Sequence, residues 1–282
     1  MKNKKTRYMT ILTAAIALSL TSCVKDELFN TPHPDQGAVI VTTDWSAKSA
    51  EAEIPQNYTL RMETEEQAVS GITNTFKTLL PQGSYELTAY NTPEHIGISG
   101  NTATVAESEP GYMEPMPGYL FSAHQTIDVM ADDTLKVTVP VKQLVRLLNV
   151  ELTVTEGDYN RVQSATATLD GVASRIDIVT GERTAVAKSL NTLVQNGNKF
   201  TTSFRLLGII PSASQKLTVS ILFTNGDTQQ IESNISNKLT DFNDRTEAKT
   251  LTGELLLPIE AGVTGATITN WKETDGGDVD AN

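Results

Sequence analysis

Short runs in which apolar and polar residues alternate recur along this 282-residue chain, and they restrict its fold to β-structure. Successive side chains of a strand point to opposite faces, so each run makes a strand with one apolar and one wetter face. The clearest faces are Val39, Val41, Thr43 and Trp45; Tyr58, Leu60 and Met62; Tyr85, Leu87 and Ala89; Leu135, Val137, Val139 and Val141; Leu148, Val150, Leu152 and Val154; and Leu217, Val219, Ile221 and Phe223. We therefore expect an all-β chain of half-buried strands.

Turn residues separate these runs. They stand at 81–83 (PQG), 156–158 (EGD) and 225–227 (NGD), and the Asn-Gly pair is typical of a hairpin turn. Many short strands joined by turns indicate a sandwich or a barrel. One segment differs: residues 185–197 (AVAKSLNTLVQNG) carry apolar residues at helical spacing, which predicts a short helix there.

The order of the runs predicts two domains. A break between residues 140 and 146 divides the strands into two β-sandwiches, at 37–143 and 144–273, and an acidic tail follows at 274–282. Apolar residues make up 39% of the chain, which is enough for two hydrophobic cores. The segment before the first strand, 23–36, contains Pro32 and Pro34 and is expected to be a stiff, extended tether.

The N-terminus has the three parts of a secretory signal peptide. Four basic residues among the first seven precede an apolar run at 8–20, and the small residues Thr21 and Ser22 follow. The run is shorter than the roughly 20 residues that a membrane-spanning helix needs, so we expect residues 1–22 to be removed. Directly behind them stands Cys23, the single cysteine, which has no partner for a disulfide and offers at most one metal ligand.

Residues 20–23 (LTSC) resemble the lipobox of bacterial lipoproteins. The resemblance implies that the sulfur of Cys23 receives a lipid and that Cys23 becomes the acylated first residue, with acyl chains such as palmitate. Each buried methylene adds about 0.8 kcal/mol of membrane affinity, so several chains hold a protein firmly. The alternative is an ordinary signal peptide with a chance cysteine at the cleavage site.

The three residues Lys25, Asp26 and Glu27 resemble the signal of one lysine and acidic residues that sends lipoproteins of Bacteroidetes to the outer face of the outer membrane. The resemblance implies an outer-membrane lipoprotein that faces the cell exterior. The alternative is a solvated tether whose charges carry no address.

Charge argues against nucleic acid as a partner. Loss of residues 1–22 lowers Lys plus Arg from 22 to 18 while Asp plus Glu stays at 34, so the mature net charge is 18 − 34 = −16. Proteins that bind nucleic acid present basic surfaces, and this chain is strongly acidic.

No catalytic signature is present in the sequence. The three histidines stand far apart, and the chain has no HExxH, GxSxG, P-loop or GxGxxG motif. The acidic tail lacks the ligand register of a calcium loop. We therefore predict no enzyme activity, no metal and no cofactor. Glycoside hydrolysis needs two carboxylates about 5–9.5 Å apart, a distance that only coordinates reveal. A surface hydrolase is therefore kept as a hypothesis that ranks below the two non-enzymatic functions described below.

Residues 111–121 (GYMEPMPGYLF) combine tyrosines, methionines, prolines and glycines in a way that suits neither a central strand nor an idle loop. Their side chains either cover a core or form a contact surface, with Tyr112, Met113 and Tyr119 as the candidate contacts. Both tryptophans, Trp45 and Trp271, are expected in core or strand-edge packing because aromatic rings bury large areas.

Four segments together resemble the fimbrillin-like surface lipoproteins of Bacteroidetes, especially their fimbrial anchor and minor-subunit branch and related lipoproteins of unknown function. The segments are 31–45 (TPHPDQGAVIVTTDW), 54–62 (IPQNYTLRM), 79–91 (LLPQGSYELTAYN) and 266–273 (ATITNWKE). The resemblance implies two tandem transthyretin-like, Greek-key β-sandwiches. It also implies a fimbrial anchor or minor structural subunit that engages fimbrillin-like subunits by β-strand addition.

No arginine stands between Cys23 and Arg61, so processing that frees a first strand is not evident. The candidate segment for pairing with a neighbour is 265–273 (GATITNWKE), with Ala266, Ile268 and Trp271 as contacts. The alternative is an ordinary last strand of its own domain.

A competing hypothesis is a glycan-binding surface lipoprotein of a polysaccharide uptake system. An exposed row of aromatic residues would favour it, but aromatic residues make up 6% of the chain and offer few candidates.

Overall fold

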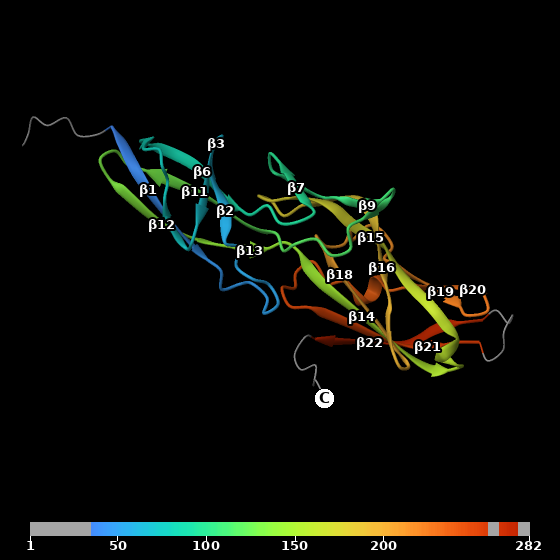
Figure 1. Cartoon of the computed structure of the whole chain (residues 1–282). Coiled ribbons are helices and arrows are strands. Elements are labelled where there is room, and N and C mark those ends of the chain that lie inside the picture. Colours follow the sequence, from blue (N-terminus) through green and yellow to red (C-terminus); the bar gives the residue numbers. More distant parts are fainter. Residues whose placement is uncertain (1–34, 259–264, 276–282) are drawn as a thin grey trace, which may run out of the picture.

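The computed structural model describes residues 35–258 and 265–275, and nearly all regular structure in them is β-strand. The predicted all-β class is confirmed. The described strands form two lobes that lie side by side in Figure 1, each made of two facing sheets. The transthyretin-like, Greek-key detail stays a prediction.

The first sandwich has one sheet in the order β12-β1-β4, with β5 also paired to β1, and a second sheet in the order β13-β11-β6-β2-β3. Its strands are β1 (Gln36–Asp44), β2 (Asn57–Met62), β3 (Glu65–Ser70), β4 (Thr73–Thr75), β5 (Leu80–Pro81), β6 (Gly83–Tyr90), β11 (Phe121–Val129), β12 (Thr134–Pro140) and β13 (Lys142–Gln143). Strands β1 and β12 run parallel, in register from Ala38 opposite Thr134 to Asp44 opposite Pro140.

The second sandwich has one sheet in the order β20-β19-β15-β16-β10-β9, to which β8 and β7 are added beside β15, and a second sheet in the order β17-β18-β14-β21-β22. Its strands are β7 (Ile96–Ser99), β8 (Thr102–Val105), β9 (Glu107–Glu109), β10 (Tyr112–Met113), β14 (Arg146–Glu156), β15 (Val162–Asp177), β16 (Arg183–Thr192), β17 (Val194–Asn196), β18 (Lys199–Leu206), β19 (Lys216–Phe223), β20 (Thr228–Asn234), β21 (Lys249–Leu256) and β22 (Thr267–Asp275). Two short 3-10 turns, η1 (Tyr159–Arg161) and η2 (Ser236–Lys238), connect strands.

Aromatic residues pack the core of the first sandwich. Trp45 is buried and makes edge contacts with the rings of Tyr58 and Phe121, at centroid distances of 5.8 and 5.4 Å. Its indole Nε1 donates a hydrogen bond of 2.8 Å to the hydroxyl of Thr43, so the one polar group of the ring is satisfied inside the core. The prediction that Trp45 packs in a core is confirmed.

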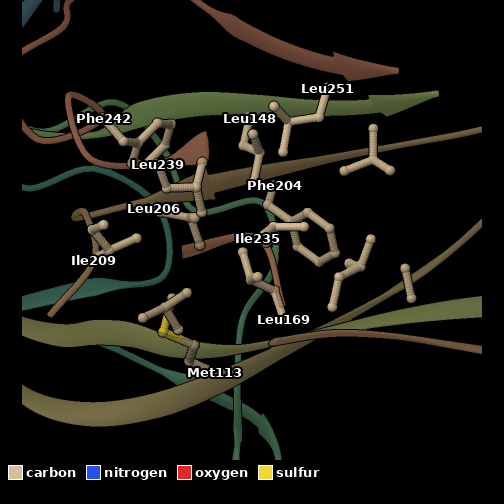
Figure 2. Packing of buried hydrophobic residues seen from close by; sticks show 14 of the residues in the cluster. Met113, Leu148, Leu169, Phe204, Leu206, Ile209, Ile235, Leu239, Phe242 and Leu251 are labelled. Carbon is tan, nitrogen blue, oxygen red and sulfur yellow. The ribbon is translucent and has the colours of Figure 1, made fainter. Parts of the chain in front are cut away.

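The core of the second sandwich follows from strict alternation in its strands. Every second residue of β14 from Arg146 to Val154 is buried, and β18, β19 and β21 show the same period of two. Figure 2 shows side chains from these strands, among them Leu148, Phe204 and Leu251, meeting between the two sheets. Burial of such side chains contributes roughly 1.5–3 kcal/mol each, so this cluster stabilises the second sandwich.

The helix predicted at 185–197 is wrong, because the segment forms β16 and β17. Nine residues of β16 pair antiparallel with β15, and two more contacts pair its middle with β10. The residues at helical spacing do not share a face: Val186 and Val194 are 61% and 63% exposed, whereas Leu193 is buried. Backbone pairing with the preceding strand β15 and with the distant strand β10 has overridden the local period.

Residues 96–113 pair with strands of the second sandwich, although their position in the sequence predicted them in the first. Strand β8 pairs with the far end of β15, and β10 runs parallel to β16. The buried residues Ile96, Ala103 and Val105 accordingly belong to the same hydrophobic cluster as β14 and β18. Figure 1 shows β7 and β9 with the second lobe, although both strands precede the last strands of the first lobe in the sequence.

The two sandwiches touch through specific hydrogen bonds. The hydroxyl of Ser122, on β11, donates to the main-chain oxygen of Ile178 at 2.7 Å in a buried contact. On the outer face of β2, the guanidinium of Arg61 donates to the main-chain oxygen of Gly100 at 2.8 Å. The first contact reaches the end of β15 in the second sandwich, and the second contact reaches the turn between β7 and β8.

Candidate functional site

The last strand, β22, forms one edge of the sheet β17-β18-β14-β21-β22. It pairs antiparallel with β21 from Thr267 opposite Leu256 to Asp275 opposite Lys249. Within the residues that the structure describes, no strand is hydrogen-bonded to the other edge of β22, although β20 lies near its start, where the main-chain N–H of Ala266 donates to Oε1 of Gln229 at 3.3 Å. An unpaired strand edge is a template for pairing with another chain, so β22 is the candidate functional site.

The three predicted contact residues of this segment, Ala266, Ile268 and Trp271, are half-buried and pack against the core of their own sandwich. The side chains between them, such as those of Thr267 and Thr269, are exposed. In the described part of the chain, residues 265–273 are therefore the last strand of their own domain. A neighbouring chain could reach the backbone edge of this strand, but not these three side chains.

Gly253 and Trp271 fit together at a bulge in the β21–β22 pair. The register shifts between Thr252 and Glu254, and Asn270 has a left-handed φ of 54°. A Cβ atom on Gly253 would lie 3.2 Å from Cε3 of the Trp271 ring and 3.0 Å from Cγ2 of Ile268. The missing side chain at 253 leaves the space that the indole occupies.

A cluster of charged residues ties β22 to the rest of the sandwich. Lys249, whose side chain is only 2% exposed, lies 2.5 Å from a carboxylate oxygen of Asp241 and 3.0 Å from one of Glu273 on β22. Lys238 lies 3.5 Å from Glu273, and Arg245 lies 3.0 Å from Asp241. The hydrogen bond from Lys249 lowers the pKa of the Asp241 carboxyl. We call these five residues the β22 latch.

All residues of the segment 111–121 except Gly111 are buried or half-buried. Met113 is 2% exposed and lies in the cluster drawn in Figure 2, so the prediction of a surface contact there is wrong: β10 pairs with β16 and turns this side chain inward. Tyr112 is half-exposed on the same strand. Tyr119 is also half-buried, and its ring packs against both hydrophobic clusters.

A polar cleft of about 710 Å³ lies between the outer face of β2, β6 and β11 and the β7–β8 turn. Among its lining residues, Nε2 of His124 lies 2.9 Å from Glu86, and Glu66 accepts a hydrogen bond of 2.7 Å from the hydroxyl of Tyr90, which lies behind the lining. Burial and the neighbouring carboxylate raise the pKa of Tyr90 to about 12, so its hydroxyl remains a donor. Arg61 closes one side through Gly100 and Asn101.

Metal chemistry has no support in the described residues, where no group of three His, Cys, Asp or Glu side chains is arranged to hold an ion. His95 is half exposed beside Glu94, and His124 is engaged with Glu86 and Thr88. His33, Cys23, Lys25, Asp26 and Glu27 lie outside the described residues, as does nearly all of the tether at 23–36. No helix in the described part is long and apolar enough to span a membrane.

Comparison with models of known protein families identifies the family of this chain. The model of the fimbrillin-A associated anchor proteins Mfa1 and Mfa2 matches residues 47–275, from the loop after β1 to the end of β22. The chain belongs to this family. A search of curated proteins finds no significant match for this Mfa2-family chain.

Solved structures share the fold of this Mfa2-family chain. The fimbrial anchor protein Mfa2 from Porphyromonas gingivalis has 10% identity and a TM-score of 0.60, over 84% of this chain and 97% of that chain. A candidate adhesin from Bacteroides ovatus has 9% identity and a TM-score of 0.64, over 86% and 96%. A candidate polysaccharide-binding protein from Bacteroides thetaiotaomicron has 9% identity and a TM-score of 0.55, over 78% and 92%. At such identities the likeness concerns the fold.

These findings confirm the predicted relation to the fimbrillin-like proteins of Bacteroidetes. The chain is a member of a family of fimbrial anchor proteins, which are structural proteins of the cell surface. Lipid attachment, the outer membrane as its site, strand addition and the identity of its partners stay predictions.

Proposed function

We propose that this protein is a non-enzymatic surface lipoprotein that acts as a fimbrial anchor or minor structural subunit. In this proposal the lipid on Cys23 holds the chain in the outer membrane, Lys25, Asp26 and Glu27 direct it to the outer face, and fimbrillin-like subunits join it by β-strand addition. Membership of the anchor family and the layout of residues 1–27 support the proposal.

The observation that carries the strand-addition part is the open edge of β22. Its nine residues carry backbone N–H and C=O groups along one side, and no strand among the described residues is hydrogen-bonded to that side. A strand that docked on this edge would gain a hydrogen-bond ladder, and its alternate side chains would add specificity. The β22 latch keeps the edge in place, so it serves as a firm template.

An accompanying feature is the position of the two ends of the described chain. Strand β1 starts at Gln36 in the first sandwich, thirteen residues after Cys23, and the open edge belongs to the second sandwich. In Figure 1 the start of β1 is at the far end of the first lobe, away from β22. A chain held by Cys23 would therefore present the β22 edge away from the membrane.

Site-specific cross-linking in intact cells tests the proposal. Because Cys23 is the single cysteine and is acylated in the proposal, a second cysteine would be the only free thiol. We would compare Thr269→Cys on β22 with Thr138→Cys, also exposed but on β12 of the first sandwich. Fimbrillin-like subunits captured through residue 269 and not through 138 are the expected result. Capture through neither position, with no pilin-like protein in the eluate of a general cross-linker, would overturn the proposal.

The glycan-binding alternative receives no aromatic platform from the described residues. All tyrosines, phenylalanines and tryptophans in 35–258 and 265–275 are buried or half-buried, and Trp45 is inside a core. A glycan uptake role that depends on stacking of sugar rings is therefore not the function that we propose.

A further inference from the structure

Arg205 differs from the other half-buried arginines of the described chain. Those others each donate to a carboxylate or a main-chain oxygen: Arg61, Arg146, Arg161, Arg183 and Arg245. Arg205 forms no ion pair among the described residues, the side chain that it interacts with is that of Tyr119, and its Nε is buried without a hydrogen-bond partner. A guanidinium that is partly withdrawn from water without an acceptor is costly, which points to a missing acceptor.

The ring of Tyr119 fixes the orientation of this guanidinium. The Cζ atom of Arg205 lies 4.5 Å from the ring centroid, so the cation is stacked on the tyrosine. Tyr119 is itself fixed, because its main-chain oxygen accepts a hydrogen bond of 2.9 Å from Asn91 and its ring packs against both cores. Stacking occupies one face of the guanidinium and leaves its N–H edge for a planar acceptor such as a carboxylate.

The pair lines a cleft of about 500 Å³ between the two sandwiches, a volume that suits a small ligand. The opposite wall is the loop between β1 and β2. It contributes the exposed carboxylates of Glu51 and Glu53, the exposed amide of Gln56 and an apolar strip of Ile54, which is 43% exposed, and Pro55. The hydroxyl of Tyr119 is a further buried polar group, close to the Arg205 cation, and burial keeps it protonated by raising its pKa.

We infer that this cleft binds a sugar acid, with Arg205 receiving its carboxylate. One carboxylate fits the single cation. The hydroxyls of a sugar can donate to Glu51 and Glu53 and bond with Gln56, and its C–H face can lie on Ile54 and Pro55. An acidic peptide has carboxylates but lacks the row of hydroxyls that can donate to the two glutamates, which disfavours it. The chemical class is a uronate, free or as a residue of a polysaccharide.

Binding of uronates to the full mature protein in detergent micelles tests the inference. We would titrate glucuronate and galacturonate, their short oligomers, and glucose and galactose as neutral counterparts, by ligand-observed nuclear magnetic resonance. We expect saturable binding of uronates and none of the neutral sugars. Tighter binding of the oligomers than of the monomers would assign the ligand to a polymer, and equal binding would assign it to a free sugar acid.

Three arginine variants locate the site. Arg205→Gln removes the charge and should weaken uronate binding at least about tenfold, because hydrogen bonds to charged groups are the strong ones. Arg205→Lys keeps the charge without the fork and should weaken it less. Arg175→Gln, at an exposed arginine on β15 outside the cleft, is the matched control and should change nothing.

The wall of the cleft offers a second test that leaves Arg205 in place. Gln56→Ala and Ile54→Ser change exposed residues of the loop, so the protein should fold as before and bind uronate several-fold more weakly. The inference is overturned if uronates show no saturable binding, if Arg205→Gln and these loop variants bind as the parent does, or if an acidic peptide or a neutral sugar binds more tightly. These measurements use the isolated protein, so they are independent of the fimbrial proposal.

Discussion

The Nζ atom of Lys249 lies 3.0 Å from Oε2 of Glu273, which joins the first residue of β21 to a residue near the end of β22. The lysine is almost fully buried, whereas the side chains of Glu273 and Asp241 are 38% and 47% exposed. The ammonium group of Lys249 therefore contacts both carboxylates, those of Asp241 and Glu273, only while β22 is paired with β21. Detachment of β22 would take one of the two carboxylate partners from this ammonium, which is unfavourable.

Glu273→Gln should loosen β22 while the rest of the fold stays intact. The change takes one charge-assisted bond from Lys249, which amounts to about 1–2 kcal/mol of local stability. Amide hydrogen exchange in β22 should accelerate by on the order of tenfold, and exchange in β15 and β19 should not change.

Glu232→Gln is the matched control for this prediction, because Glu232 pairs with Lys216 at 2.9 Å on an exposed surface of the same sandwich. Such exposed, solvent-screened pairs contribute little to stability. If the two variants showed the same exchange in β22, the latch would have no special role.

Acid should release the same strand through Asp241. The hydrogen bond from Lys249 lowers the pKa of this carboxyl in the folded protein. A group with a lowered pKa stabilises the fold fully above its unfolded pKa, about 4, and loses that contribution as the pH falls through its lower folded value. Fluorescence of Trp271 in a Trp45→Phe background should thus be constant from about pH 7 to pH 5 and change below about pH 4. In Asp241→Asn the part of the change that belongs to the latch should disappear, and an unaltered acid transition would contradict this account.

Sequence alternation located the strands whose burial is decided by their own local pattern. The apolar faces of β1, β2, β6, β12, β14 and β19 were all visible as every second residue. The same method was wrong at 185–197, since the placement of β16 depends on pairing with β15 and β10, which no local period reveals. Met113 was misplaced for the same reason, because its burial follows from a parallel pair formed with Met113 opposite Ser189.

The sequence predicted the segment that forms the β22 edge, but not the side chains that hold this strand in place or line the Arg205 cleft. Residues 265–273 were singled out, but Lys249 and Arg205 were missed, as each is an ordinary charged residue within a strand-like run. For Lys249 one signal was available: it continues the inward series of Leu251, Gly253 and Leu255 in β21, where a lysine needs buried partners. Arg205 gave no such signal, because its neighbour Tyr119 is distant in sequence.

Lipid attachment is tested by Cys23→Ala. The parent should incorporate an alkyne-labelled fatty acid and sediment with the outer membrane, because several acyl chains give stable anchoring. The variant should incorporate none and leave the membrane fraction. Label retained in the variant would place the lipid on another residue. Replacement of Lys25, Asp26 and Glu27 by alanine should keep the label and remove the protein from the reach of external protease.

Gly253→Ala probes the contact between β21 and the indole of β22. A Cβ atom would lie 3.0 Å from Cγ2 of Ile268 and 3.2 Å from both Trp271 and Leu152, so either the ring or the strand must shift. Overpacking of this kind costs about 1–3 kcal/mol, and most of it should appear as faster hydrogen exchange in β22. Gly97→Ala, in β7, is the matched control, since a Cβ there meets nothing within 4 Å and should leave stability unchanged or slightly higher. Equal thermal midpoints and equal exchange in the two variants would show that β22 does not depend on the space at Gly253. Faster capture of fimbrillin-like subunits by Gly253→Ala in the cross-linking experiment would show in addition that a loosened β22 is the better docking edge, whereas slower capture would show that the firm strand is the template.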